Sequence, residues 1–245
     1  MVCRLPKYCD PFRPLTFFVL GLGAPLLILL ILHGVAFFDP NLARDIFRGE
    51  RGPVEILQVL FLTGALVVGL RVSKLALMQN VPYLLGWISL MVLGTVYTLG
   101  EEASWGQHFF LWETPDTFSR LNDQNESNLH NISSWFDQKP RLILEIGIIV
   151  SGIIYPIWRQ LKKTPPFSPK TLAYWIWPPV ICAPSAICVV LARIFDSLSE
   201  RGFQYTPGIN GIQHAEEQEL FMYLFVFTYA VVLLWKLKRE NNRHF

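Results

Sequence analysis

Six long apolar runs constrain the fold of this chain more than any other feature of its sequence. A helix of about 20 apolar residues is long enough to cross the hydrocarbon core of a bilayer. Backbone groups in lipid must pair within their own segment, so runs of this length predict helices and not irregular chain. The predicted spans are about 15–38, 54–72, 82–102, 142–158, 173–196 and 214–237.

The composition supports a membrane protein rather than a soluble domain. Charged residues make up only 16% of the chain, well below the roughly 25% of soluble domains. The fold class we predict is therefore all-α, a single polytopic membrane domain over 1–245, with short helices in the loop 113–141. The first run lacks a small-residue cleavage site, so we expect it to be retained as a span. The four cysteines have no metal-site spacing, and we expect no disulfide among them.

Charge distribution predicts the orientation of the spans. The N-terminal tail, the segments 71–81 and 159–172 and the C-terminal tail hold 13 of the 21 Lys and Arg residues but only two acids. The alternate segments hold 17 of the 19 acids. Because cytoplasmic loops carry the excess of Lys and Arg, we expect both termini to be cytoplasmic. The localisation predicted is the bacterial inner membrane, with the acidic loops outside.

Two adjacent carboxylates, Glu101 and Glu102, end the third apolar run. Charged side chains at membrane depth are costly and usually mark a site, a proton relay or a buried pair. We expect the helix to continue toward Trp112, which would place Glu101, Ser104 or Trp105, and His108 on one face. The stretch 100–108 is therefore predicted to form part of a polar site that opens outward.

Other carboxylates and imidazoles lie on the same side of the membrane. Glu126 and His130 have i, i+4 spacing, and His214 and Glu217 have i, i+3 spacing, so each pair shares a helix face. Carboxylates and imidazoles from several helices can bind zinc, manganese or iron. The predicted metal ligands are Glu101, Glu102, His130, Glu217 and His214, with Glu126 and Glu102 as catalytic groups.

Further polar residues near this cluster suit substrate binding. Structural ion pairs are the alternative explanation for the carboxylates. The asparagines from Asn122 to Asn131 recur at spacing three, which makes an amide-rich stripe on a helix. The predicted substrate-binding residues are Glu55, Trp105, Gln107, Asn125, Asn128 and Arg193. In the alternative, Glu101, Glu102 and Glu217 form structural ion pairs with Arg48, Arg51 and Arg193. We interpret His33 as a packed histidine and not as a ligand.

Four motifs resemble a set found in bacterial multi-pass membrane proteins of unassigned function. They read GERGPVE, EEASWGQ, QNESNLHN and EEQE, and they lie in order within residues 45–225. The resemblance implies a multi-pass fold and a site, but it names no reaction. The site residues that it implies are Glu55, Glu101, Glu102, Trp105, Gln107, Glu126, Asn128, His130, Glu216 and Glu217.

A weaker likeness concerns Ser104 and His108, whose spacing resembles that of alkaline ceramidases and adiponectin-receptor-like hydrolases. Those proteins have seven spans and a pair of histidines in the last one. This chain has six runs and only His214 in its last run, so the likeness does not predict a zinc site in this protein.

Three functions follow from these patterns as hypotheses. The first is an enzyme, with a divalent metal, that acts on a lipid or lipid-linked substrate from the outer face. The second is an ion-coupled transporter, although the inner halves of the spans hold almost no polar residues. The third is a non-catalytic subunit or assembly factor with a membrane-protein partner. The expected surroundings are the lipid bilayer, and the basic C-terminal tail indicates membrane anchoring, not nucleic-acid binding.

Overall fold

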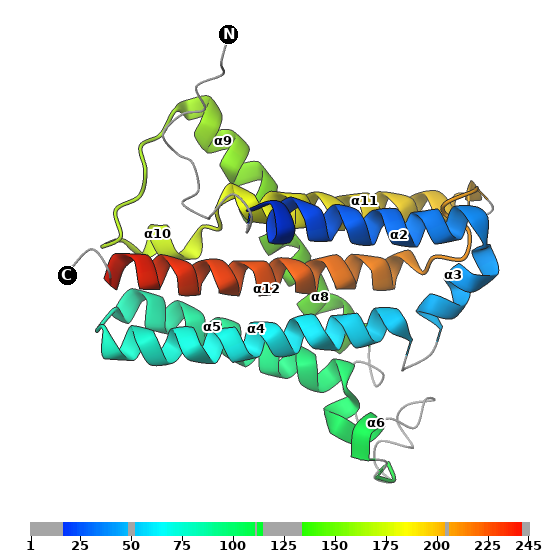
Figure 1. The fold of residues 1–245 in the computed structure, drawn as a ribbon, viewed down its shortest axis with the longest axis horizontal. Coiled ribbons are helices and arrows are strands. Elements are labelled where there is room, and N and C mark those ends of the chain that lie inside the picture. The colour runs from blue at the N-terminus through cyan, green and yellow to red at the C-terminus, as the bar shows by residue number, and fades with distance from the viewer. Residues whose placement is uncertain (1–16, 49–51, 111, 115–133, 204–205, 242–245) are drawn as a thin grey trace.

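The computed structural model describes residues 17–48, 52–110, 112–114, 134–203 and 206–241, and all regular elements within these ranges are helical (Figure 1). Six helices are long and apolar enough to cross a membrane, which confirms the predicted all-α membrane bundle. These spans are Val19–Phe38, Pro53–Met78, Pro82–Glu102, Lys139–Lys162, Leu172–Glu200 and His214–Asn241.

The first half of the chain forms three spans and one short helix between them. The π-helix η1 (Phe17–Gly23) continues into α2 (Ala24–Phe38), and α3 (Pro40–Phe47), α4 (Pro53–Met78) and α5 (Pro82–Glu102) follow. A proline opens each of the last three helices, where its missing N–H costs no hydrogen bond. Asp39 caps α3, because its Oδ1 accepts from the backbone N–H groups of Asn41 and Leu42 at 3.0 Å.

Helix α4 is longer than the sequence predicted. It runs to Met78, so the expected loop 73–81 is reduced to residues 79–81. Arg71 and Lys74 lie on this last part of the helix and are both exposed. Long basic side chains can lie along an apolar helix while their charge reaches water, so they do not end it.

The second half of the chain contains a continuous span, a broken span and a long final helix. Helix α8 (Ser134–Ile149), the π-helix η3 (Val150–Ile154) and α9 (Tyr155–Lys162) follow one another without a gap. The next span comprises α10 (Leu172–Ile176), η4 (Val180–Cys182) and α11 (Ala183–Glu200). The chain ends with α12 (His214–Asn241).

The break between α10 and α11 falls at Trp177-Pro178-Pro179, inside a span predicted to be continuous over 173–196. Carbonyl groups freed by such a break need donors at membrane depth. Helix α12 supplies them. The Tyr229 hydroxyl lies 2.6 Å from the carbonyl oxygens of Trp175 and Ile176, and Lys236 Nζ donates to those of Tyr174 and Trp177.

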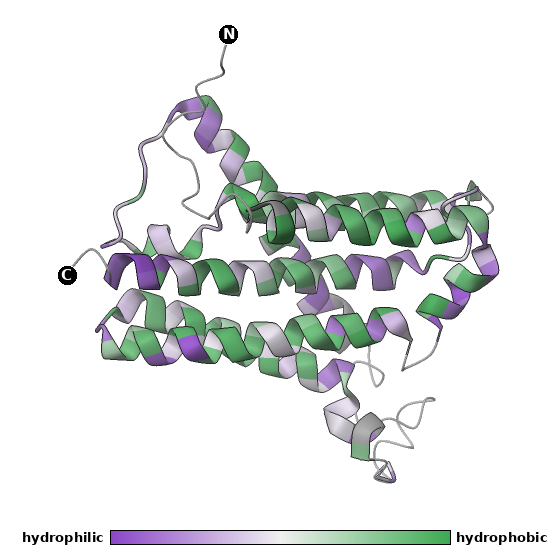
Figure 2. Ribbon diagram, viewed as in Figure 1, coloured by the Kyte–Doolittle hydropathy of each residue, from purple (hydrophilic) through white to green (hydrophobic). Residues whose placement is uncertain are grey.

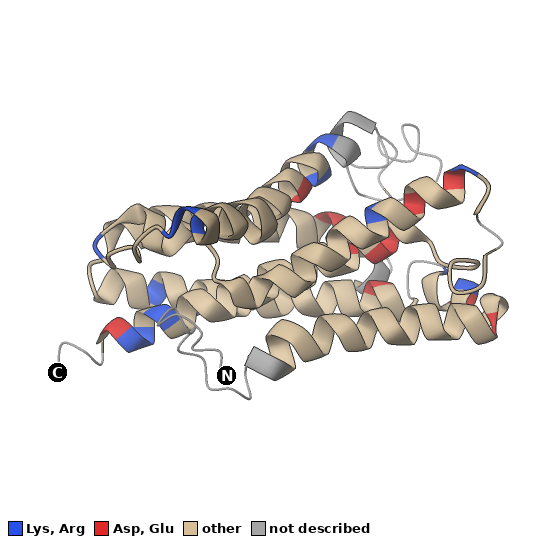
Figure 3. Ribbon diagram, turned by 90° about the horizontal axis from the view of Figure 1, so that it is seen from above, with Lys and Arg blue, Asp and Glu red and all other residues tan. Residues whose placement is uncertain are grey.

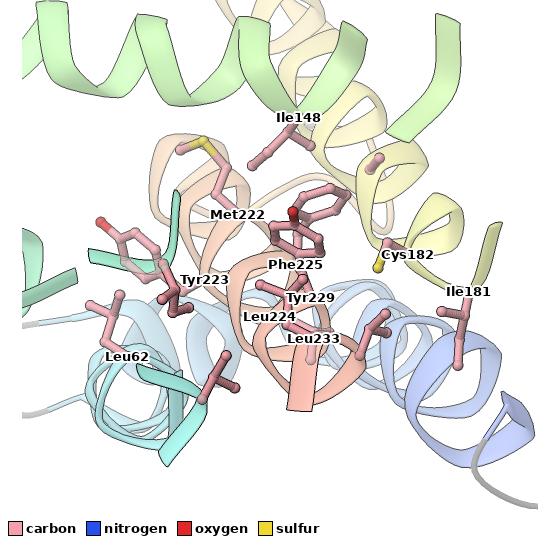
Figure 4. Packing of buried hydrophobic residues seen from close by; sticks show 14 of the residues in the cluster. Leu62, Ile148, Ile181, Cys182, Met222, Tyr223, Leu224, Phe225, Tyr229 and Leu233 are labelled. Carbon is pink, nitrogen blue, oxygen red and sulfur yellow. The ribbon is translucent and has the colours of Figure 1, made fainter. Parts of the chain in front are cut away.

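Helix α12 is the centre of the bundle, with α2 and α11 on one side and α4 and α5 on the other (Figure 1). Buried residues make up 72% of its most apolar stretch, against 17–44% in the other spans. Leu224, Phe225 and Leu233 from α12 pack with Ile148 of α8 and Leu62 of α4 (Figure 4). The core is therefore built around one helix, and a polar residue on that helix needs its own partners.

Acidic residues gather at one end of the bundle (Figure 3). We call this the acidic end; it comprises the last turns of α2, α5 and α11, the first turns of α4, α8 and α12, and helix α3. The opposite, basic end carries mostly Lys and Arg (Figure 3). Between the two ends the spans are apolar over most of their length (Figure 2).

Candidate functional site

A carboxylate held between two histidines lies at the acidic end. Glu217, in the first turn of α12, is fully buried. Its Oε1 lies 2.8 Å from His33 Nε2 of α2, and its Oε2 lies 2.8 Å from His214 Nδ1. The predicted His214–Glu217 pair is thus present, while His33, interpreted as a packed histidine, proves to be its third member. We call these three residues the His–Glu–His unit.

The hydrogen-bond partners restrict where the protons of this unit lie. His33 Nδ1 is 2.5 Å from the Gly208 carbonyl oxygen, which can only accept, so this nitrogen carries a proton. One more proton lies between His33 Nε2 and Glu217 Oε1. His214 Nδ1 donates to the other carboxylate oxygen, and in the neutral form of the ring this tautomer leaves the lone pair on Nε2. That Nε2 is buried and has no hydrogen-bond partner in the part of the chain that the structure describes.

Aromatic packing holds the two imidazoles in place. The rings of His33 and His214 stack with their centroids 6.1 Å apart. Phe195 of α11 packs against both, at 4.8 Å from His33 and 5.7 Å from His214. The unit is therefore fixed by three helices, α2, α11 and α12, which suits a group whose orientation matters.

A second polar group surrounds Glu102 at the end of α5. The Tyr223 hydroxyl of α12 donates to Glu102 Oε1 at 2.7 Å. Glu55 and Glu216 lie near enough for their charges to interact with that of Glu102. Gln58, fully buried on α4, donates from Nε2 to the carbonyl oxygen of Glu216 at 3.1 Å and to its Oε2 at 3.2 Å. Three predicted site residues, Glu55, Glu102 and Glu216, are thus brought together.

Arg141 of α8 contacts the first turns of α12 at the same acidic end. Its guanidinium forms an ion pair with Glu219 at 2.8 Å and donates to the carbonyl oxygen of Ala215 and to Gln218 Oε1, both at 2.9 Å. Gln218 is itself buried, and its Nε2 has no hydrogen-bond partner among the described residues. A guanidinium shared by three acceptors in this way fixes α8 against the first turns of α12.

The expected continuation of the third span as one helix is wrong. Helix α5 ends at Glu102, and Ser104, Trp105 and Gly106 have φ values of 42°, 53° and 96°. These left-handed conformations turn the chain before the short helix α6 (Gln107–Phe110), so the predicted common face of Glu101 and His108 is not formed. The turn instead lets Trp105 Nε1 donate to Glu101 Oε1 at 2.9 Å.

The described metal-ligand candidates do not converge on one point. Glu101 accepts from Trp105, Glu102 accepts from Tyr223, and Glu217 is shared by the two histidines. No group of three or more His, Cys, Asp or Glu side chains within the described ranges is placed to hold a metal ion. In the His–Glu–His unit both ring nitrogens of His33 already have partners, so the unit does not fit an ion without rearrangement.

The remaining predicted residues separate into those that the structure describes and those that it does not. Gln107 Nε2 donates to Thr114 Oγ1 at 2.7 Å, away from the His–Glu–His unit. Arg193 forms an ion pair with Asp196 at 3.7 Å, whereas the alternative interpretation expected it in a structural pair with a glutamate of the site. The structure of four further predicted residues lies outside the described residues: Asn125, Glu126, Asn128 and His130.

The sequence reasoning missed His33, Gln58, Arg141 and Tyr223. Each is polar and lies in or beside an apolar run, which is the one signal in the sequence that pointed to them. Their partners are 74 to 184 residues away along the chain, so only the packing of the helices reveals the contacts.

Searches against family models, curated proteins and solved structures gave no match. The resemblance to bacterial multi-pass proteins therefore stays a prediction.

Proposed function

We propose that this protein is a membrane enzyme that acts at its acidic end on a lipid or lipid-linked substrate. The observation that carries the proposal is the His–Glu–His unit, a fully buried carboxylate with both oxygens on imidazole nitrogens near the ends of the apolar helices. Ionisable groups in such positions are costly, and a functional site is the default interpretation.

The unit suits general acid–base chemistry. Glu217 accepts from His214 Nδ1 and so fixes the tautomer that leaves Nε2 free to take a proton. A carboxylate that orients an imidazole base in this way is the arrangement used by many hydrolases. His33 shares a proton with the other oxygen of Glu217, and it can donate that proton to a leaving group once its Nε2 has moved away from Glu217. His214 is therefore assigned as the base and His33 as the acid.

Metal-dependent chemistry has less support than this proton-transfer role. The ligand candidates Glu101, Glu102 and Glu217 are each engaged with separate partners. The role of Glu126 as a catalytic base remains a prediction.

Transport, the second hypothesis, has less support for a different reason. Below the acidic end, α12 buries a run of mainly apolar side chains, from Leu220 to Phe225, against its neighbours. A proton or ion that crosses the bilayer needs a sequence of polar groups or water, and this stretch of α12 provides little of either kind. The assembly-factor hypothesis has no observation in its favour within the described residues.

The proposed orientation places the acidic end outside the cytoplasm of a bacterial inner membrane, with both termini inside. Two observations support it. Nearly all acids lie at one end of the bundle while the other end carries mostly Lys and Arg (Figure 3), and the basic loops are the ones that the positive-inside rule assigns to the cytoplasm. The substrate would then be reached from the outer leaflet.

Comparative lipid analysis of whole membranes tests this function without a known substrate. Cells that produce the wild type, His214→Gln or Glu217→Gln at matched levels would have their total lipids quantified by mass spectrometry. We expect one lipid class to change with the wild type and to stay at the vector level with both variants. Tyr174→Phe at the basic end is the matched control and should behave as the wild type. Identical lipid profiles for the wild type and both site variants would refute the enzyme proposal.

A further inference from the structure

A pocket opens beside the His–Glu–His unit on the side of the bundle formed by α2 and α11. Its volume is about 520 Å³, within the roughly 300–1,000 Å³ typical of small-molecule sites. Its lining is apolar apart from His33 and backbone groups. The side chains of Leu30, Phe37, Phe195 and Ile209 form its walls, and Gly34 leaves space on the α2 side.

The mouth of this pocket faces the bilayer. Leu30, which lines the pocket, is 69% exposed, and its neighbours Leu27 and Ile31 on α2 are 60% and 52% exposed. The span Val19–Phe38, which includes α2, is the most apolar of the six spans. An exposed leucine face on a membrane-spanning helix is covered by the hydrocarbon chains of lipids. Lipids are therefore the molecules that can enter the pocket from its mouth.

The depth of the pocket matches the junction between a lipid's chains and its headgroup. His33 lies five residues before the end of α2, which corresponds to about 8 Å along the helix axis. The headgroup and interfacial layer on each side of the hydrocarbon core is of similar thickness, roughly 5–8 Å. A lipid chain beside Leu30 therefore places its ester or phosphate region at the level of His33.

We propose that the pocket holds a hydrocarbon chain of a membrane lipid and presents the polar end of that lipid to His33. This inference rests on the proposed function and names its substrate class: a lipid that enters sideways from the bilayer between α2 and α11. Phe195 contacts both imidazoles and lines the pocket, so it connects the pocket wall to the His–Glu–His unit.

Gly34 provides a sharp test because an added side chain has room to enter the pocket. A Cβ built at this helical glycine meets no atom within 4 Å, so Gly34→Phe fills the pocket without a backbone clash. Gly94, on α5, has the same open surroundings and is exposed, so Gly94→Phe is the matched control at another lipid-facing position. Gly34→Leu is a milder version should the larger side chain impair folding.

The probe is a phosphatidylglycerol with a photoactivatable diazirine in one palmitoyl chain, incorporated into nanodiscs with the protein. After irradiation, labelled peptides are quantified by mass spectrometry. We expect labelling to concentrate on peptides of α2 and of residues 206–213, to fall at least fivefold in Gly34→Phe and to be unchanged in Gly94→Phe. Equal labelling of Gly34→Phe and the wild type, or labelling spread evenly over all six spans, would overturn the inference.

A variant of the base separates this inference from the function on which it rests. His214→Gln leaves every residue that lines the pocket unchanged, so it should keep the labelling of the wild type. If labelling is normal but the lipid profiles described above do not differ between wild type and site variants, the pocket stands and the enzyme proposal fails. If the profiles differ but Gly34→Phe is labelled as the wild type is, the enzyme stands and this entry route fails.

Discussion

Replacement of Glu217 by leucine tests whether the buried carboxylate carries the charge that balances His33. Removal of one partner from a buried ion pair costs about 3–5 kcal/mol, because the other charge is left uncompensated. Glu217 is fully buried, but the His33 side chain is 19% exposed and can regain some hydration or lose its proton. We therefore expect Glu217→Leu to lower the free energy of unfolding by about 3 kcal/mol, at the lower end of that range.

A double-mutant cycle isolates the interaction itself. Hydrogen bonds that involve a charged group contribute about 1.5–3 kcal/mol, whereas neutral hydrogen bonds between membrane helices average about 0.6 kcal/mol. We expect a coupling in the first range between His33→Leu and Glu217→Leu, since both atoms of the 2.8 Å contact would belong to an ion pair. Unfolding in mixed micelles, titrated with dodecyl sulfate and followed by tryptophan fluorescence, gives the four free energies.

The exposed ion pair between Arg193 and Asp196 is the matched reference. Its atoms are 3.7 Å apart and the two side chains are 59% and 31% exposed, so its coupling should stay below about 1 kcal/mol. A His33–Glu217 coupling no larger than that of Arg193→Gln with Asp196→Asn would refute the assignment of a buried charge pair.

Three further outcomes follow from the packing and the charge distribution. Gly152→Leu should destabilise the bundle by about 1–3 kcal/mol, because a Cβ there would lie 2.7 Å from a side chain of α11. Gly147→Leu is the control, since Gly147 has open space around it and the change should be tolerated; thermal unfolding in detergent compares the two variants. Trp87→Phe should cost about 0.5–1.5 kcal/mol through loss of its 2.8 Å hydrogen bond to a buried tyrosine of α12, measured in the same micelle titration. In a variant without the four native cysteines, Arg201→Cys should react with an impermeant maleimide on intact cells and Lys163→Cys only after lysis; the reverse result would invert the proposed orientation.

The sequence predicts the spans well because the bilayer requires each spanning helix to be long and apolar. Each run can be recognised by these two properties without knowledge of the other runs. The predicted run 82–102 coincides with α5, and the run 214–237 starts at the first residue of α12. The errors in the prediction concern turns and breaks of the backbone, which a hydropathy profile does not detect. The turn at Ser104, Trp105 and Gly106 and the break after α10 are examples. At the turn Trp105 donates to Glu101, four residues before it, and at the break the Tyr229 hydroxyl of α12 contacts the freed carbonyl groups.

The site was only partly predictable, for a reason that His214 and His33 illustrate. His214 and Glu217 are three residues apart on one helix, so their contact follows from helical geometry alone. His33 is 184 residues from Glu217, and its pairing depends on which of the other spans packs beside the first turn of α12. A lone histidine in an apolar run gives no information about that choice, so the third member of the unit needed the structure.

The His–Glu–His unit is not needed for the stability of the bundle, which favours a catalytic role for it. A leucine at position 217, with apolar partners at the other two positions, would hold the bundle as well or better, since buried ion pairs seldom stabilise a protein relative to well-packed apolar side chains. The central helix α12 nevertheless keeps a carboxylate at a fully buried position and binds both of its oxygens. The imidazole beside it retains a buried lone pair with no partner among the described residues. An unpaired buried polar atom costs about 1–3 kcal/mol, and His214 Nε2 shares this condition with the Gln58 and Gln218 amides of the same end of the bundle. Among these atoms only the imidazole nitrogen is a base, so His214 Nε2 is the position where a substrate proton is expected to bind.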